Sequence, residues 1–311
     1  MRKLVKYLLL VMLLGSAPGL YAYSELVILG DSLSDTGNHP AALLGTPYPY
    51  YKNRISNGPV AVDVLAQLLG LSADHSGYLF ANGSGGNYAV SGANASGTEI
   101  HDLSKQLSAM LADRSTRLDD QALYLLIIGG NDIRDASVLD SYVQGVHAVN
   151  QAADSIRAAV QQLMARGAKS ILVSNAPDIS IIPETAERAK TNTGLVNRAA
   201  QLSRDFNLRL KQQLDALSLS KGRRIMRYDF YGQFNNIVKN SSKYGFSNAN
   251  EACFEHSPYS FHPQCDFNKF VFFDSIHPTA KSHELLGQGL ADVALERNSS
   301  AIPAMLLLLL N

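Results

Sequence analysis

The chain has 311 residues, of which 46% are hydrophobic and 17% are charged. This composition provides enough apolar side chains for one large core, and no change in composition divides the chain into separate domains. Residues 1–22 contain three basic side chains and no acidic one, so the remainder has 24 basic and 27 acidic residues and a formal charge of −3. A strongly basic, nucleic-acid-binding surface is therefore excluded.

The first 22 residues have the three-part layout of a secretory signal peptide. Three basic residues precede the apolar run LLLVMLLG, and the small, turn-forming residues SAPG follow it. The run is too short for a comfortable membrane span, which leaves an uncleaved anchor as the weaker alternative. We expect cleavage near Ala22, although Leu20 is bulky for its place before the cut. The sequence thus predicts an exported protein, extracellular or periplasmic, with residues 23–311 as one domain.

Short apolar runs alternate with segments of helical period along the chain, and this alternation is typical of a parallel sheet covered by helices. The predicted strands are residues 26–29, 123–128, 170–173, 225–229 and 270–273. The predicted helices are residues 59–69, 140–166, 184–217 and 280–297. With right-handed crossovers, these elements give a three-layer α/β/α sandwich with a mostly parallel, doubly wound sheet, in which functional groups collect at the carboxyl ends of the strands.

Three segments do not follow this alternation. Residues 78–98 are rich in Gly, Asn and Ser, and we interpret them as a loop whose backbone approaches another part of the molecule closely. Residues 230–266 are aromatic and rich in asparagine, and we interpret them as a lid-like loop that gates a substrate. The apolar end, residues 301–310, is too short to span a bilayer, and either packs on the core or contacts lipid or a partner.

Both cysteines of the chain lie inside the second of these segments. In an exported protein the simplest arrangement joins Cys253 to Cys265 in a disulfide. The same stretch, CFEHSPYSFHPQC, also has the spacing Cys-x2-His-x5-His-x2-Cys, which offers four ligands to zinc. The tight central spacing and an oxidising compartment favour the disulfide.

Ser32 follows the first predicted strand, where a helix or turn begins. Asp31 or Ser32 can serve there simply as a helix cap. As a nucleophile, Ser32 would stand at the carboxyl edge of the sheet and needs a neutral, oriented histidine as its base. His277 meets this need best, because Asp274 directly follows the last predicted strand and can hold the Nδ1 of His277. We expect His101, His147 and His283, which lack such a neighbour, to lie on the surface.

Acyl transfer also requires hydrogen-bond donors at the developing oxyanion. The run IIGGND places Asn131 at the same carboxyl edge as Ser32, and its side-chain amide can donate. Gly92, in the glycine-rich loop, offers a backbone N–H without a side chain to block a substrate. Each of these turns is common when taken singly, so the combination and its order carry the interpretation.

Four blocks of the sequence resemble the GDSL, or SGNH, hydrolases. They are GDSLSDTGN at residues 30–38, NYAVSGAN around Gly92, GGND at residues 129–132 and DSIHPT at residues 274–279, in the order of that family and across nearly the whole chain. The resemblance implies Ser32 as nucleophile, His277 as base and Asp274 as its orienting group. It also implies an oxyanion hole formed by the N–H groups of Ser32 and Gly92 and the amide of Asn131.

Within that family, the export signal, the length and the cysteine-containing loop look most like bacterial lysophospholipases A and glycerophospholipid:cholesterol acyltransferases. The resemblance implies a serine esterase that hydrolyses fatty-acyl esters, most of all lysophospholipids, without a metal or organic cofactor. The implied partner is a lipid substrate, presented singly or at a membrane or micelle surface. An acyltransferase or a carbohydrate acetylesterase on the same residues, and a metal-dependent hydrolase using the cysteine and histidine cluster, are the alternatives.

Overall fold

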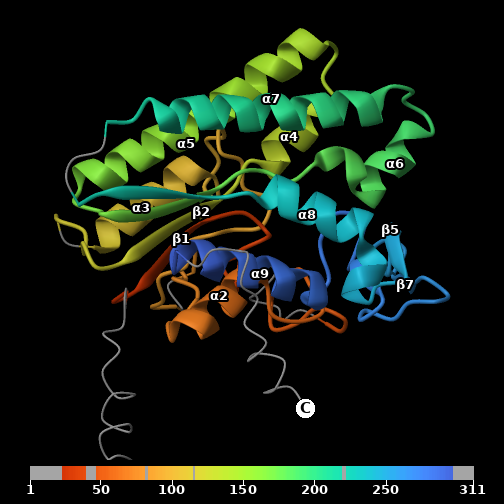
Figure 1. Ribbon diagram of the computed structural model, residues 1–311, viewed down its shortest axis with the longest axis horizontal. Coiled ribbons are helices and arrows are strands. Elements are labelled where there is room, and N and C mark those ends of the chain that lie inside the picture. Colours follow the sequence, from red (N-terminus) through yellow and green to blue (C-terminus); the bar gives the residue numbers. More distant parts are fainter. Residues whose placement is uncertain (1–22, 40–46, 81–82, 115, 219–221, 297–311) are drawn as a thin grey trace, which may run out of the picture.

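Figure 1 shows the computed structural model of the chain, which describes residues 23–39, 47–80, 83–114, 116–218 and 222–296. The predicted signal peptide, residues 1–22, and the apolar end, residues 301–310, lie outside the described residues.

Four parallel strands form the central sheet, in the order β1-β2-β3-β4. They are β1 (Leu26–Gly30), β2 (Leu123–Ile127), β3 (Ser170–Ser174) and β4 (Arg224–Tyr228). Every residue of β1 and β2 is buried, as expected for parallel strands covered on both faces. These four strands and the parallel α/β architecture were predicted from the apolar runs, and the structure confirms them.

A fifth, irregular segment extends the sheet on the other side of β1. The N–H of Ile28 donates to the carbonyl of Gly86, at 3.0 Å, and the N–H groups of Tyr88 and Val90 donate to the carbonyls of Ile28 and Gly30. After β1 the chain first forms residues 86–90 on one side of β1 and later forms β2 on its other side. The sheet is therefore doubly wound. In such a sheet, ligands bind at the carboxyl ends of the two strands where the winding reverses, here β1 and β2.

Helices cover both faces of the sheet (Figure 1). Helices α5 (Tyr142–Ala165) and α7 (Leu195–Asp215) pack together on one face, and α2 (Ala61–Leu69) and α9 (Ala280–Ala294) pack together on the other. Helix α3 (Leu103–Asp113), which contacts β1 and α5, was not predicted. Helix α5 begins with a capping box between Ser141 and Gln144, a local signal that fixes its first turn.

The helix predicted over residues 184–217 is interrupted. It consists of α6 (Pro183–Ala189), preceded by the 3₁₀ turn η2 (Ile179–Ile181), and of α7. Gly194 stands directly before α7 with a φ of 97°, in the left-handed region where a helix cannot continue. Glycine at this point lets the chain turn from α6 into α7 without strain.

The segment predicted as one lid-like loop, residues 230–266, contains regular structure. Helix α8 (Phe230–Lys239), the 3₁₀ turn η3 (Ser241–Tyr244), strand β5 (Asn248–Ala252) and the hairpin of β6 (Phe254–Glu255) and β7 (Ser260–Phe261) follow one another. Helix α8 buries Phe230, Phe234 and Ile237, whose i, i+4 and i+3 spacing forms one apolar face.

Strand β8 (Phe270–Phe272) does not extend the central sheet, contrary to its predicted place there. It pairs in parallel with β5 instead. The N–H groups of Cys253 and Phe254 also donate to the carbonyls of Phe272 and Phe273, so the backbone groups of this short strand are already in use.

A disulfide joins Cys253 to Cys265, with their Cα atoms 4.8 Å apart, as predicted. The cysteines are therefore not thiolates that could hold zinc. The histidines of the alternative zinc cluster have other contacts. His256 Nδ1 lies 3.1 Å from the hydroxyl of Tyr50, and His262 Nδ1 accepts from the N–H of Gln264.

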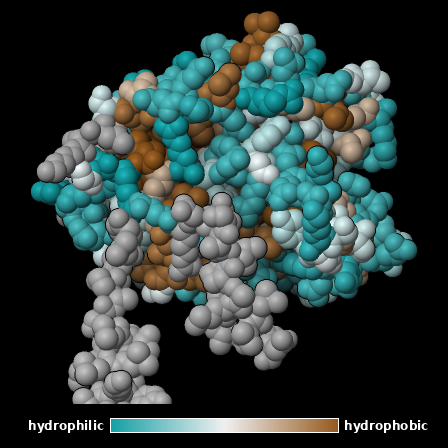
Figure 2. Space-filling model, viewed as in Figure 1, coloured by the Kyte–Doolittle hydropathy of each residue, from teal (hydrophilic) through white to brown (hydrophobic). Residues whose placement is uncertain are grey.

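On the face shown in Figure 2, hydrophilic side chains dominate and hydrophobic ones form separate clusters. Within the described part of the chain, no helix is both long enough and apolar enough to cross a membrane.

We predict that Gly129→Ala destabilises the fold strongly. Gly129 has a φ of 120° and caps α4 (Gly130–Ser137), and an added Cβ would lie 2.4 Å from the ring of Phe206. Strain and overpacking together should lower the free energy of unfolding by about 2–4 kcal/mol in urea titrations. Gly70→Ala is the control, because Gly70 has a φ of 68° in open space and should cost only about 1 kcal/mol. Equal costs for the two substitutions would contradict this account.

Candidate active site

Ser32 lies in a turn directly after β1, at the carboxyl edge where the winding of the sheet reverses. Asp31 supplies the side-chain cap of this turn, because its Oδ1 accepts the N–H of Leu33 at 3.0 Å. The carbonyl of Asp31 also accepts the N–H groups of Ser34 and Asp35. The hydroxyl of Ser32 takes no part in capping and contacts a histidine instead.

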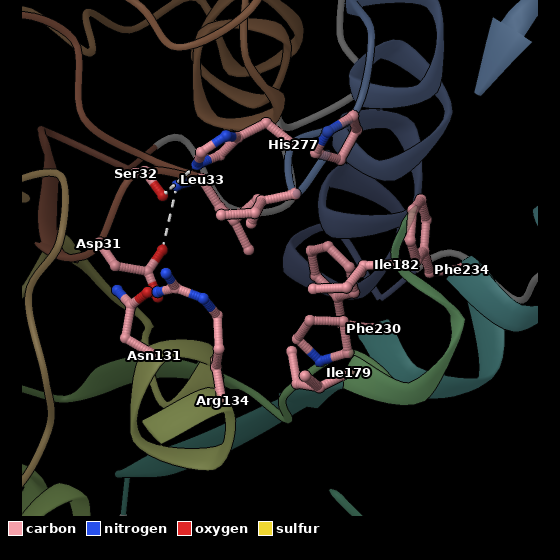
Figure 3. A pocket seen from close by; sticks show the side chains of 14 residues that line it. Asp31, Ser32, Leu33, Asn131, Arg134, Ile179, Ile182, Phe230, Phe234 and His277 are labelled. Atoms are coloured by element: carbon pink, nitrogen blue, oxygen red, sulfur yellow. Dashed lines mark hydrogen bonds between the residues drawn. The ribbon is translucent and has the colours of Figure 1, made fainter. Parts of the chain in front are cut away.

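His277 joins Ser32 to Asp274. Its Nε2 lies 2.9 Å from the Oγ of Ser32, and its Nδ1 lies 2.8 Å from the Oδ2 of Asp274. The Oδ1 of Asp274 accepts the backbone N–H groups of Ile276, at 2.8 Å, and of His277, at 2.6 Å. A short turn after β8 thus holds both side chains, with the imidazole directed at Ser32 (Figure 3).

The electrostatics of Asp274 suit a group that orients an imidazole. Burial raises the pKa of this carboxyl, but the charge of His277, its ring hydrogen bond and the two backbone N–H groups lower it by more. The net pKa of Asp274 lies below its ordinary value. The carboxylate is therefore ionised at neutral pH and can stabilise an imidazolium.

Three hydrogen bonds bring together the segments that carry the three donors suggested by the sequence for an oxyanion. The side-chain amide of Asn131 donates to the carbonyl of Ala93 at 2.9 Å, next to Gly92. On the other side of Gly92, the N–H and hydroxyl of Ser91 donate to Asp35, three residues after Ser32. The backbone N–H groups of Ser32 and Gly92 have no hydrogen-bond partner among the described residues, so both are available to a substrate.

Asp31 is a second buried carboxyl beside the nucleophile. Burial raises the pKa of Asp31 to about 7, with a smaller contribution in the same direction from the charge of Asp132. The hydrogen bond from Leu33 and the charge of His277 lower the pKa but do not compensate. About half of the Asp31 side chains are therefore neutral at neutral pH, which limits the negative charge next to Ser32.

One pocket contains Ser32 and His277 and has a polar and an apolar part. The cavity itself is narrow, with a volume of about 40 Å³. Figure 3 shows Asp31, Ser32 and Asn131 on one side and apolar side chains from η2 and α8 on the other. The apolar lining consists of Leu33, Pro177, Ile179, Ile182, Phe230, Phe234, Ile276 and Pro278. The lining of this part favours contact with an apolar group over a polar one.

Several functional residues have no signal in the sequence. Gln106, on α3, is fully buried and binds both backbone groups of Gly30, at 2.8 and 2.7 Å, which fixes the end of β1 before Ser32. Arg134 lines the pocket from α4, a helix that was not predicted. The apolar side chains of the pocket come from segments far apart in the sequence.

One of the histidines expected on the surface is buried. His147 is exposed as predicted, but the prediction was wrong for His283, which is 1% exposed and whose Nδ1 accepts the N–H of Ala61 at 3.2 Å. Helix α9 packs against α2, and this contact covers His283. Among the residues described, no three His, Cys, Asp or Glu side chains are arranged to hold a metal ion.

Residues 26–290 match the family described as GDSL-like lipase/acylhydrolase. The chain belongs to this family. It is therefore a carboxylic ester hydrolase, and the match spans the strand before Ser32, both proposed oxyanion segments and the turn with His277.

Curated relatives of this GDSL hydrolase come from plants and bacteria. A GDSL esterase/lipase of Arabidopsis thaliana is 26% identical, over 85% of this chain and 89% of its own. Lipase 1 of Photorhabdus luminescens is 26% identical over 86% of this chain and half of its own. A phosphatidylcholine-sterol acyltransferase of Aeromonas hydrophila is 28% identical over 75% of this chain and 66% of its own. Among solved structures, an acetylxylan esterase of Geobacillus stearothermophilus aligns with a TM-score of 0.45 and 14% identity, over 89% of this chain and 96% of that one.

We predict that Asp31 makes the stability of this GDSL hydrolase fall as the pH rises. Folded Asp31 keeps its proton up to about pH 7, whereas the unfolded chain releases it near its ordinary value of 3.8. Between these values the folded state binds more protons, so the free energy of unfolding decreases with pH. Asp31→Asn should remove this pH-dependent loss of stability. The free energy of unfolding of the variant minus that of wild type, measured by urea unfolding, should therefore be about 2–3 kcal/mol larger at about pH 8 than at about pH 5.

The control for this measurement is Asp140→Asn, because Asp140 is exposed. That variant should follow the wild type at both pH values. If Asp31→Asn also follows the wild type, Asp31 is ionised throughout and the account of its burial is wrong.

Proposed function

We propose that the protein is a secreted serine esterase that hydrolyses fatty-acyl esters, most of all lysophospholipids. One observation carries this proposal: the Oγ of Ser32 lies 2.9 Å from the Nε2 of His277 at the head of an apolar pocket. A serine needs such a base to become a nucleophile, and a fatty-acyl chain needs such a pocket.

In the proposed reaction, the Oγ of Ser32 attacks the ester carbonyl carbon and its proton passes to the Nε2 of His277. The oxyanion receives hydrogen bonds from the N–H groups of Ser32 and Gly92 and from the amide of Asn131. Collapse of this intermediate breaks the ester bond, and His277 returns its proton to the departing glycerol oxygen. Water then attacks the acyl-Ser32 ester, with His277 again as the base.

Asp274 acts through His277 in this proposal. Its contact with Nδ1 leaves Nε2 as the proton acceptor toward Ser32, and its negative charge stabilises the imidazolium in both halves of the reaction. Because backbone N–H groups fix the carboxylate, little reorganisation is required when the charge forms.

An acyltransferase is the second candidate, since a relative named phosphatidylcholine-sterol acyltransferase is as similar as the named lipases. The same acyl-Ser32 ester would then react with a sterol hydroxyl in place of water. A carbohydrate acetylesterase is less well supported, because an acetyl group would leave the apolar part of the pocket unfilled.

Export is part of the proposal and is supported by the signal-peptide layout of residues 1–22 and by the Cys253–Cys265 disulfide, which an oxidising compartment preserves. The gate predicted for the cysteine-bounded segment stays a prediction. That segment does not line the pocket of Ser32, but the ring of Phe254 packs 5.6 Å from the ring of Phe273, directly before Asp274.

We predict that Ser32→Ala abolishes turnover while the fold is retained. The loss of kcat should be at least about 10⁴-fold on every ester, because no other group can take the acyl chain. The assay uses aryl esters, lysophospholipids, phospholipids and acetylated xylan, each with and without cholesterol as acceptor. Ser108→Ala is the control, since Ser108 is exposed on α3. Retained turnover in Ser32→Ala would refute the mechanism, and turnover of acetylated xylan alone would refute the substrate.

We predict that Ile179→Phe shortens the acyl chain that the pocket accepts. Ile179 is buried in η2 and lines the apolar part, so a larger side chain should lower kcat/KM on long-chain aryl esters about ten-fold relative to the acetyl ester. Val143→Phe, on the exposed first turn of α5, is the matched control. An unchanged ratio, with an unchanged melting temperature, would show that the acyl chain binds elsewhere.

A further inference from the structure

Arg134 is a charged pocket residue that the proposed reaction leaves unused. It lines the same pocket as Ser32 and His277, and its side chain is 29% exposed. Its Nε donates to Glu184 at 2.6 Å, and one Nη donates more weakly to the same carboxylate at 3.4 Å. The other terminal nitrogen, Nη1, makes no hydrogen bond within the described residues. The guanidinium therefore keeps donors for a ligand in the pocket.

The surrounding charges leave this corner of the pocket positive. Glu184 is shared, because Arg188 also approaches it, at 4.0 Å. Two guanidinium groups thus face one carboxylate. The first turn of α4 also contains Asp132, but burial raises the pKa of its carboxyl, which accepts the N–H groups of Ala95 and Ser96. Among the described residues that line the pocket, the carboxyl group is that of Asp31, whose pKa burial raises to about 7. An anionic group is the ligand that this arrangement favours.

The spacing of Arg134 matches the length of a glycerol phosphate. Arg134 lies three residues after Asn131 on α4, so their Cβ atoms are about 5–6 Å apart on one face of the helix. In a lysophospholipid, five bonds of roughly 1.5 Å separate the ester oxygen from the phosphorus, a span of about 6 Å. With the ester carbonyl at Asn131, the phosphate falls within reach of the guanidinium.

We propose that Arg134 binds the phosphate of the lysophospholipid headgroup and thereby selects phosphate-bearing acyl esters over neutral ones. This inference rests on the proposed function and names the part of the substrate that the site recognises. Planar, two-pronged donors suit a phosphate, which accepts two parallel N–H bonds.

Glu184 links the helix that carries Arg134 to the turn that carries His277. Its own backbone N–H donates to the carbonyl of Ser275 at 2.9 Å, between Asp274 and His277. The Arg134–Glu184 pair therefore holds α4 and α6 against the turn that carries the base. If the Arg134–Glu184 pair has only a structural role, loss of either residue should lower activity on all substrates alike. If Arg134 binds phosphate, only loss of Arg134 should lower activity on phosphate-bearing substrates selectively.

The test compares two substrates with the same acyl chain, a lysophosphatidylcholine and a monoacylglycerol, in mixed micelles of a neutral detergent. The readout is the ratio of kcat/KM for the two substrates. Arg134→Gln should lower this ratio about ten-fold or more, mainly through KM, and Arg134→Lys should restore part of it. Glu184→Gln breaks the same ion pair but keeps the cation, so it should leave the ratio at or above the wild-type value.

A ratio that stays constant in Arg134→Gln, or that falls equally in Glu184→Gln, would overturn the inference, even with esterase activity intact. Competition of inorganic phosphate with lysophosphatidylcholine, combined with an unchanged ratio in Arg134→Gln, would also overturn it. The proposed function fails separately, if wild-type protein does not hydrolyse lysophosphatidylcholine at all. Melting temperatures of all variants distinguish lost binding from lost folding.

Discussion

A buried carboxylate, Asp35, holds together the two loops on which the rest of the site depends. It is fully buried and accepts the N–H groups of Gly37 and Asn38, each at 2.8 Å, and the N–H and hydroxyl of Ser91, at 2.7 and 2.9 Å. Burying polar oxygens costs little only when they accept hydrogen bonds in this way. The loop that carries Ser32 is therefore fixed to the loop that carries Gly92, at the edge where the sheet reverses its winding.

The remaining reacting groups are attached to this pair of loops from two other parts of the chain. Asn131 reaches them from the first turn of α4, through the carbonyl of Ala93. The turn with His277 is held by its own carboxylate contacts and by the backbone of Glu184. Because each attachment uses a backbone group, the positions of the proposed reacting atoms depend little on flexible side chains. The hydrogen-bond donors are therefore already in place before negative charge develops on the substrate.

The sequence revealed those parts of the molecule whose cause is local. Apolar runs marked β1 to β4, and the glycine and polar residues after them marked the strand ends where Ser32 and Asn131 stand. The pairing of β8 with β5 and the burial of His283 depend on partners distant in the sequence. The interruption before Gly194 has a local cause, but the helical period on both sides of the glycine concealed it. Arg134 was not predicted because its contact with Glu184 and its position in the pocket depend on residues distant in the sequence.

Chemistry and substrate choice occupy different segments of this fold but meet on one helix. The proposed reacting groups follow β1 and β2 and lie in the turn after β8, whereas the apolar lining comes from η2, α8 and the residues around them. Changes in that lining can therefore alter the acyl group without disturbing Ser32 or His277. Helix α4 is the exception, because it presents Asn131 to the carbonyl and Arg134 one turn later to the pocket. A shift of this helix would move both residues together, which would couple the proposed headgroup contact to the proposed stabilisation of the oxyanion.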